Sequence, residues 1–150
     1  MSVTISIAKV KLVRESSHRY DIDSKRISSP ETAVDAINAA LDLKNEAQEV
    51  LGTLFLDTKN HVTGVMEVTR GTLSASLSHP REIFKGAILH NAASIILFHN
   101  HPSGDVTPSR EDLLITERIV KCGQILDIPM LDHIIIGYNR HYSLKEHDQI

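Results

Sequence analysis

The segment ASIILFHNHPSGDVTPSRED, residues 93–112, carries the clearest signals of secondary structure in this sequence. It begins with a short apolar run, ASIILF, which has the length of a buried strand. Turn-forming residues follow at 100–108, and Ser109 then stands before a segment with helical patterning. The stretch therefore predicts a buried strand over 93–99, a loop, and a helix over 109–126 that Ser109 caps.

Helical and strand patterns alternate on both sides of this stretch. Ser29 and Pro30 are typical of a helix start, with a capping hydroxyl followed by proline at the first helical position. The further expected elements are helices over 31–43 and 80–91, a hairpin of strands at 49–57 and 61–69, and strands over 130–137 and 141–146. Helices between strands, without a repeat or a low-complexity linker, indicate an α/β fold with a mixed β-sheet flanked by helices.

The N-terminal residues form a separate feature. Residues 3–13, VTISIAKVKLV, alternate between apolar and polar side chains and predict a strand. We therefore expect residues 1–28 to form an N-terminal strand or arm, and residues 29–150 to form the single domain. A strand outside the domain could pair with a second copy of the chain, which makes a homodimer one expected assembly.

Length and composition restrict the classes of function. The 150 residues carry a formal net charge of −3, with 41% hydrophobic and 23% charged residues, as in an ordinary globular protein. No apolar run approaches the roughly 20 residues that span a bilayer, and the single cysteine, Cys122, excludes an intrachain disulfide. Without a signal-peptide pattern at the start, the sequence predicts a cytoplasmic protein. The negative charge argues against strong nonspecific nucleic-acid binding, although residues 1–30 are locally basic.

Two histidines and an aspartate within residues 93–112 form a candidate metal site. Because side chains on a strand alternate, His99 and His101 point to the same face and can share one ion. Asp112 lies in the first turn of the following helix, so one reversal of the loop brings its carboxylate to the same point. Two imidazoles and one carboxylate are the ligands of a catalytic zinc site, which keeps its fourth position for water. The pattern predicts a Zn²⁺ cofactor.

A structural interpretation of Asp112 stays open. Ser109-x-x-Asp112 is close to a capping box, in which the aspartate accepts a hydrogen bond from the Ser109 amide at the helix start. Asp132 and His133 leave a similar choice between residues that orient a metal ligand and a satisfied core histidine. The histidine pair itself favours a metal site, because it lies at the C-terminal end of a buried strand. Ligands of α/β sheets commonly bind at the C-terminal ends of the strands.

The sequence resembles a known metalloprotease family. LFHNHPSGDVTPSRED, residues 97–112, is similar to the His-x-His-Pro-x(6)-Ser-x-x-Asp signature of the JAB/MPN (JAMM) family. GTL at 71–73, HPREIFKGAI at 79–88 and LDHIIIG at 131–137 resemble its RadC branch specifically. The resemblance covers about residues 30–146 and implies a JAB/MPN-like fold, an architecture similar to that of cytidine deaminases. RadC proteins usually carry a helix-hairpin-helix segment ahead of this domain, so we expect this chain to be a stand-alone RadC-type domain.

The resemblance also implies catalytic roles. Members of this family activate a zinc-bound water with a glutamate inside a Glu-x-x-Gly-x-Leu pattern, which EVLGTL at 49–54 reproduces. Glu49 is therefore the expected general base, and Glu67, on the next expected strand but without that pattern, is the alternative. Ser109 resembles the family serine whose hydroxyl donates a hydrogen bond to the tetrahedral oxyanion. The same hydroxyl can also cap the helix.

Two classes of function follow. The first is a zinc-dependent hydrolase of peptide or isopeptide bonds, acting on a peptide or protein substrate that the sequence does not name. The second is a metal-stabilised accessory or binding module of DNA-repair or mobile-element machinery without hydrolytic activity. Three protein ligands and a candidate base favour the hydrolase, because a structural zinc usually has four protein ligands. A zinc nucleobase deaminase is excluded, because its signature needs His-x-Glu and Cys-x-x-Cys and this chain has one cysteine.

Overall fold

The computed structural model describes residues 3–9, 11–16, 26–71 and 79–150. Its regular elements are α1 (Pro30–Leu41), the short 3-10 helix η1 (Leu43–Asn45), β1 (Val50–Leu56), β2 (Val62–Arg70), α2 (Pro80–Leu89), β3 (Ser94–Asn100), α3 (Arg110–Leu126), β4 (Met130–Ile136) and β5 (His141–Ser143). The predicted helices and the strands of the domain are all present, with boundaries that differ by a few residues.

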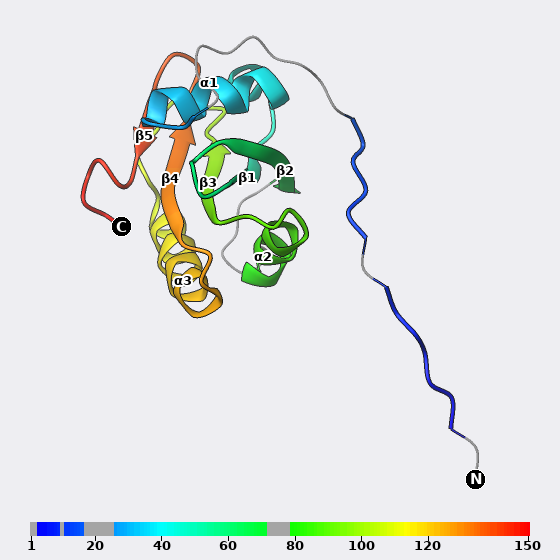
Figure 1. Ribbon diagram of the computed structural model, residues 1–150. Helices are drawn as coiled ribbons and strands as arrows, with labels where there is room; N and C mark the ends of the chain where they lie inside the picture. The colour runs from blue at the N-terminus through cyan, green and yellow to red at the C-terminus, as the bar shows by residue number, and fades with distance from the viewer. Residues whose placement is uncertain (1–2, 10, 17–25, 72–78) are drawn as a thin grey trace.

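One five-stranded sheet organises these elements, with the strand order β2-β1-β3-β4-β5. β3 and β4 are parallel, and the other neighbouring pairs are antiparallel. Seen along the edge of the sheet, α1 covers one face, and α2 and α3 cover the other (Figure 1). The expected α/β fold with a mixed sheet between helices is confirmed, and it is consistent with a JAB/MPN-like fold.

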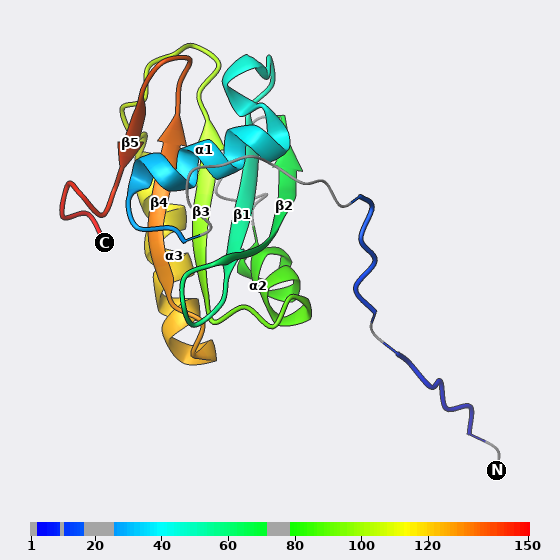
Figure 2. The same ribbon diagram turned by 45° about the horizontal axis from the view of Figure 1, so that its top comes forward.

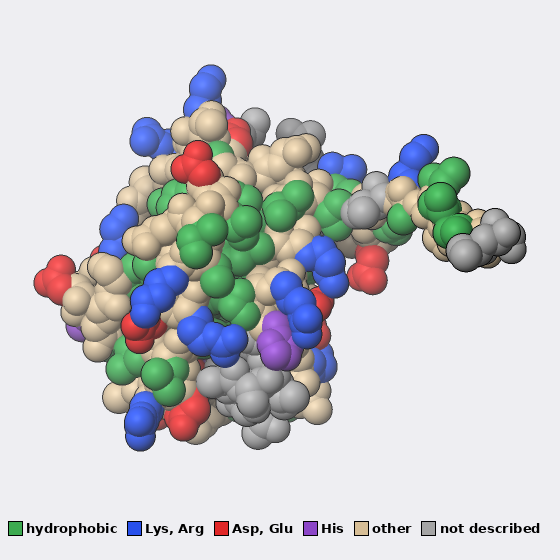
Figure 3. Space-filling model, turned by 90° about the horizontal axis from the view of Figure 1, so that it is seen from below, with side chains coloured by type: hydrophobic (Ala, Val, Ile, Leu, Met, Phe, Trp, Pro, Cys, Tyr) green, Lys and Arg blue, Asp and Glu red, His purple; other side chains and the backbone are tan. Residues whose placement is uncertain are grey.

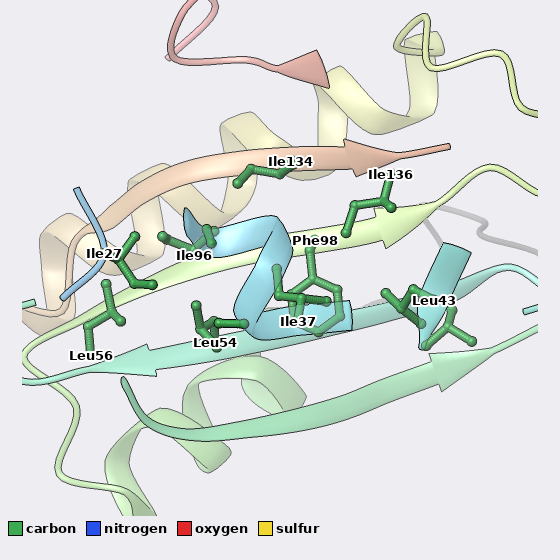
Figure 4. Packing of buried hydrophobic residues seen from close by; sticks show 12 residues of the cluster. Ile27, Ile37, Leu43, Leu54, Leu56, Ile96, Phe98, Ile134 and Ile136 are labelled. Carbon is green, nitrogen blue, oxygen red and sulfur yellow. The ribbon is translucent and has the colours of Figure 1, made fainter. Parts of the chain in front are cut away.

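The two central strands β1 and β3 are buried along their whole length, because helices cover both of their faces. Each face has its own hydrophobic cluster. The cluster beneath α1 includes Ile37, Leu54, Ile96, Phe98 and Ile134 (Figure 4). The cluster beneath α2 and α3 includes Phe55, Ile83, Leu97, Ile115 and Ile119. The unbroken apolar runs of β1 and β3 thus reflect a sheet with two covered faces.

Strand alternation distributes the residues at the end of β3 between these two faces. Ile95 and Leu97 belong to the cluster on the α3 side, and Ile96 and Phe98 belong to the cluster on the α1 side. Continuing this alternation places His99 toward α3 and Asn100 toward α1. The C-terminal ends of the parallel strands β3 and β4 lie at the same end of the sheet. The loop after β3 and the η1 segment also lie at this end (Figure 2). The predicted site residues therefore lie at this end of the sheet.

The predicted strand over 3–13 is wrong for the described residues. Residues 3–9 and 11–16 pair with no strand, and Ile5 and Ile7 are 82% and 99% exposed. Figure 1 draws them extending away from the sheet. An alternating sequence becomes a strand only when a neighbour supplies hydrogen-bond partners, and no described part of the chain does so here. Residues 17–25 of the expected arm lie outside the described residues, and pairing across a homodimer stays a prediction.

Smaller boundary differences have local causes. The first helix ends at Leu41, before the expected end, because Asp42 adopts a left-handed conformation with φ 50°. The last strand ends at Ser143, because residues 144–148 form a turn, in which the Asp148 amide donates to the Lys145 carbonyl oxygen and the Gln149 amide donates to that of Leu144. Neither difference moves a residue of the candidate site.

The outer face of α2 and α3 exposes hydrophobic side chains between lysines and arginines (Figure 3). The large exposed hydrophobic residues on these two helices are Ile88, Leu113, Leu114, Ile125 and Leu126. Among the described residues, no helix combines the length and the apolar character needed to cross a membrane.

Gly52 in β1 permits a close approach within the α1-side core. A Cβ atom at this position would overlap the ring of Phe98 and lie 2.8 Å from the Met66 carbonyl oxygen. We expect Gly52→Ala to lower the free energy of unfolding by about 1–3 kcal/mol, because the fully buried ring has no room to move. Gly86→Ala is the control: there the new Cβ meets mainly the flexible end of Met66, and alanine favours the helix. Equal denaturation midpoints for the two variants would contradict this prediction.

Candidate metal centre

His99 and His101 bring two imidazole nitrogens together at the end of β3. Their Nε2 atoms lie 2.9 Å apart. His99 is fully buried, and the side chain of His101 is 16% exposed. The Nδ1 atom of His101 points the other way and lies 2.6 Å from the Asp105 carbonyl oxygen in the following loop. The loop thus holds the His101 ring so that Nε2 faces the shared point.

Asp112 reaches the same point from the first turn of α3. Its Oδ1 atom lies 3.2 Å from Nε2 of His99, and its Oδ2 atom lies 3.5 Å from Nε2 of His101. The capping box is also present: Oδ2 accepts a hydrogen bond from the Ser109 amide at 2.7 Å, and the Ser109 hydroxyl oxygen accepts one from the Asp112 amide. The two interpretations of Asp112 are therefore compatible, because capping orients the carboxylate toward the histidines.

The three donor groups fit a tetrahedral zinc ion. Zn–N and Zn–O bonds of about 2.0–2.1 Å separate neighbouring ligand atoms in a tetrahedron by about 3.3 Å. The corresponding distances among His99, His101 and Asp112 are 2.9, 3.2 and 3.5 Å. Imidazole and carboxylate are also donor types that zinc accepts. These residues could hold a zinc ion with small adjustments and leave one coordination position open.

Glu49 lies beside this group, immediately before β1. One of its carboxylate oxygens is 3.9 Å from Nε2 of His101, and its side chain is 24% exposed. Glu49, His99 and His101 each offer a ligand atom within 4.8 Å of the others, so this cluster could hold a metal ion. Glu49 can therefore act either as a ligand beside the two histidines or as a base next to an ion that Asp112 helps to bind.

Glu67, the alternative base, is engaged elsewhere. Both of its carboxylate oxygens accept hydrogen bonds from the Arg70 guanidinium, at 2.9 and 2.8 Å. Arg70 also pairs with Glu46 at 2.8 Å, and these two carboxylates raise the pKa of Arg70 above its ordinary value. Both oxygens of Glu67 are thus occupied by Arg70, whereas Glu49 lies beside His101. The geometry favours Glu49 over Glu67.

A buried hydrogen-bond chain links His99 to α3. Nδ1 of His99 lies 2.8 Å from Nε2 of His133, and Nδ1 of His133 lies 2.6 Å from the Thr116 hydroxyl. That hydroxyl donates to the Asp112 carbonyl oxygen at 2.6 Å. A His99 ring that binds a metal through Nε2 carries its hydrogen on Nδ1, so every bond of the chain then has one donor and one acceptor. His133 therefore orients His99, as one of the two sequence interpretations predicts.

The charges at the site follow from this arrangement. In the metal-free protein, burial raises the pKa of the Asp112 carboxyl, but hydrogen bonds that the Nε2 atoms of His101 and His99 donate outweigh it and hold the pKa well below its ordinary value. The hydrogen bond to Asp112 raises the pKa of His101. Burial lowers the pKa of His133 well below its ordinary value, which keeps this imidazole neutral. The site therefore offers an ionised carboxylate and a neutral supporting histidine.

Asp132, the neighbour of His133, binds groups other than the predicted metal ligands. Its carboxylate accepts hydrogen bonds from the Ser143 hydroxyl and from the amides of His133 and Lys145. Burial raises its pKa, and these hydrogen bonds oppose the shift. Asp132 thus fixes the segment after β5 to β4, and only its neighbour His133 contacts a predicted metal ligand.

Comparison with known proteins agrees with this geometry. The family described as "RadC-like JAB domain" matches residues 27–149, most of the chain. The chain belongs to the RadC-like JAB domain family. Membership confirms the resemblance that the histidine motif and its neighbours indicate.

Relatives similar to this RadC-like JAB domain include UPF0758 proteins of clostridia. The protein from Clostridium beijerinckii is 53% identical over 121 residues, which cover 81% of this chain and 52% of that protein. The protein from Clostridium perfringens is 50% identical over 129 residues, covering 85% of this chain and 56% of that protein. The protein from Clostridium kluyveri is 48% identical over 143 residues, covering 93% and 62%. The chain therefore spans about half to three fifths of the length of these relatives.

A groove of about 490 Å³ opens next to the candidate metal site of this RadC-like JAB domain. It lies between the residues around η1 and the start of the β4–β5 turn, and it is lined by Leu43, Glu46, His101, Pro102, Ile136 and Tyr138 among others. Its volume falls in the range of ligand sites in proteins. His101 belongs to the wall of this groove, so the groove adjoins the candidate metal site.

Thr116 is a part of the site that sequence reasoning missed. It lies one helical turn after Asp112, on the same face of α3, and this spacing was the available signal. We expect Thr116→Val to lower the free energy of unfolding by about 1–3 kcal/mol, because it leaves the His133 Nδ1–H buried without an acceptor. We also expect about tenfold weaker zinc binding, measured by calorimetry, because His99 loses its support.

Thr53→Val is the matched control for Thr116→Val. Thr53 is also fully buried, but among the described residues its hydroxyl has no hydrogen-bond partner. Its replacement should leave zinc affinity unchanged and keep or raise the free energy of unfolding. Equal effects of the two variants on both quantities would contradict the proposed support of His99.

Proposed function

We propose that this RadC-like JAB domain is a zinc-dependent hydrolase of peptide or isopeptide bonds. The observation that supports this best is the convergence of His99, His101 and Asp112 on one point, with the Glu49 carboxylate 3.9 Å from His101. Three ligands leave an open position, which is the arrangement of catalytic zinc sites. Zinc in this position would polarise the substrate carbonyl and lower the pKa of a water molecule to about 7.

Glu49 supplies the proton transfers in this proposal. Its carboxylate takes a proton from the attacking water as the new C–O bond forms. It gives this proton to the leaving nitrogen as the C–N bond breaks, so Glu49 ends the cycle ionised. The acyl part leaves as a carboxylic acid and the other part as an amine, which balances the addition of one water molecule.

Ser109 is the proposed oxyanion donor. Its hydroxyl oxygen accepts a hydrogen bond from the Asp112 amide at 3.1 Å. A serine that accepts one hydrogen bond still has its own O–H to donate. In this proposal the Ser109 O–H donates to the oxygen that becomes negative in the tetrahedral intermediate, while the same residue caps α3.

The groove beside His101 is the proposed site for part of the substrate. Its wall combines apolar surface from Leu43, Pro102 and Ile136 with polar groups at the rim. Such a mixed lining suits an extended peptide segment, whose backbone needs hydrogen bonds and whose side chains need apolar contacts.

The test is zinc-dependent release of new amino groups. A mixture of peptides with chemically blocked amines is incubated with the zinc-loaded protein, with the metal-free protein, and with metal-free protein to which zinc is returned. We expect new amines in the first and third samples only. Equal release with and without zinc would contradict the hydrolase. A zinc-dependent rise in melting temperature without any release would instead support the accessory or binding module of DNA-repair or mobile-element machinery.

A further inference from the structure

The Asn100 side chain connects the end of β3 to the residues on both sides of Glu49. Its Oδ1 atom accepts a hydrogen bond from the Val50 amide at 2.7 Å. Its Nδ2 group donates to the carbonyl oxygens of Gln48 at 2.9 Å and Glu46 at 3.3 Å. Asn100 is only 2% exposed and is separated from these residues by about 50 positions in the sequence.

These hydrogen bonds begin where the backbone pairing of β1 with β3 stops. The paired register runs from Leu56 and Ser94 to Leu51 and His99. Beyond that pair, the chain from 46 to 49 is irregular, and it obtains hydrogen bonds from the Asn100 carboxamide instead of the β3 backbone. On the opposite side, the Gly71 amide donates to the Glu49 carbonyl oxygen at 2.8 Å. The backbone at Glu49 is thus held from both neighbouring strands.

We propose that Asn100 is a positioning residue that sets the location of the Glu49 carboxylate relative to the two histidines. The role of Glu49 as a base rests on the proposed function, whereas its location beside His101 is a property of the structure. Asn100 stands between His99 and His101 in the sequence, so the same strand end that carries the two imidazoles also fixes the segment that carries Glu49. The distance between them then depends in part on this short, buried connection.

A carboxamide suits this task better than any similar side chain. It must accept from one amide and donate to two carbonyl groups at the same time. Aspartate would keep the acceptor for Val50 but would place a second oxygen against the carbonyl oxygens of Gln48 and Glu46. Alanine would remove all three hydrogen bonds. The two variants therefore separate loss of the whole connection from loss of its donating half.

The experiment compares Asn100→Ala and Asn100→Asp with Asn38→Ala. Asn38 is the control, because its side chain also accepts a hydrogen bond from a backbone amide, that of Lys44, which is not one of the three groups that Asn100 binds. The first measurement is hydrogen exchange at the Val50 amide. The second is zinc affinity by calorimetry. The third is the change that zinc causes in the ¹³C signal of the Glu49 carboxyl group.

We expect the Val50 amide to exchange about tenfold faster in Asn100→Ala and to stay protected in Asn100→Asp. Zinc affinity should stay within about tenfold of the original in both variants, because no ligand is changed. The zinc-induced shift of the Glu49 carboxyl signal should shrink in both variants and stay unchanged in Asn38→Ala. If Asn100→Ala does not fold, Asn100→Asp carries the test alone.

The outcomes separate this inference from the proposed function. An undiminished zinc-induced shift at Glu49 in the folded Asn100 variants would overturn the positioning role. Both proposals would be overturned if, in the unsubstituted protein, zinc shifts the NMR signals of His99 and His101 but not the ¹³C signal of the Glu49 carboxyl group. A shift that depends on Asn100, in a protein that releases no amine from any peptide, would refute the hydrolase and leave the positioning role intact. If hydrolysis is found, kcat should fall by about 100-fold in Asn100→Ala with KM little changed.

Discussion

Glu49→Gln should lower kcat for peptide hydrolysis by about 10²–10⁴-fold, the range that a general acid–base contributes, while the protein still binds one zinc ion. Glutamine keeps the size of the side chain but cannot accept the proton from water. The two histidines and Asp112 are unchanged, so zinc affinity should change little. Single-turnover kinetics and zinc content by mass spectrometry measure the two quantities.

Glu67→Gln is the control for this prediction. It breaks the pairing with Arg70, which is partly exposed and contributes little to stability. Hydrolysis and zinc content should both stay near those of the original protein. Loss of activity in Glu67→Gln with full activity in Glu49→Gln would show that the general base had been assigned to the wrong residue.

Asp112→Asn should weaken zinc binding by at least about 100-fold. A structural zinc site with four protein ligands has a binding free energy of roughly 10–16 kcal/mol, or about 3 kcal/mol for each ligand. Loss of one ligand then corresponds to about 100-fold in affinity. The amide oxygen of asparagine can still accept from the Ser109 amide, so the helix cap largely remains. Calorimetric titration of the metal-free protein with zinc is the direct measurement.

Ser109→Ala completes the comparison, because it removes the hydroxyl half of the capping box and leaves the Asp112 carboxylate in place. It should lower the free energy of unfolding by about 1 kcal/mol and keep zinc affinity nearly unchanged. If Asp112→Asn behaves in the same way, the aspartate is only a cap. The metal ligands would then be Glu49, His99 and His101, and Glu49→Gln would lose zinc as well as activity.

Local sequence signals predicted most of the fold. Ser29 and Ser109 cap the helices they were expected to cap, and the apolar runs at 93–98 and 50–56 form strands buried on both faces. The caps are predicted correctly because their interactions lie within three residues of one another, and the strands because an unbroken apolar run of this length is typical of a strand covered on both faces. The strand over 3–13 failed because its partner would have to come from elsewhere, which an alternating pattern does not report.

The sequence predicted the candidate metal ligands but not the link from Asn100, because only the ligands lie close together in the sequence. His99, His101 and Asp112 lie within 14 positions of one another, and their spacing places them together. The link from Asn100 to Val50 spans 50 positions and has no spacing rule.

The engagement of Glu67 by Arg70 depends on a bulge that the sequence pattern does not show. Leu51 pairs with Thr69 and Gly52 with Glu67, so one extra residue of β2 interrupts the alternation. The interruption brings residues 67 and 70 to the same side of the strand, where an uninterrupted alternation would put them on opposite sides.

His99, His101 and Asp112 come from the end of β3, the residue after it and the start of α3, whereas Glu49 stands immediately before β1, far earlier in the chain. In the proposed function, affinity for the ion depends on His99, His101 and Asp112, whereas cleavage of a bond depends on Glu49, so the two properties can be inherited separately. Under that proposal, a descendant with another residue at position 49 would keep its architecture and its ion while losing only the reaction. Enzymes built in this way can give rise to inert binding proteins by a single substitution.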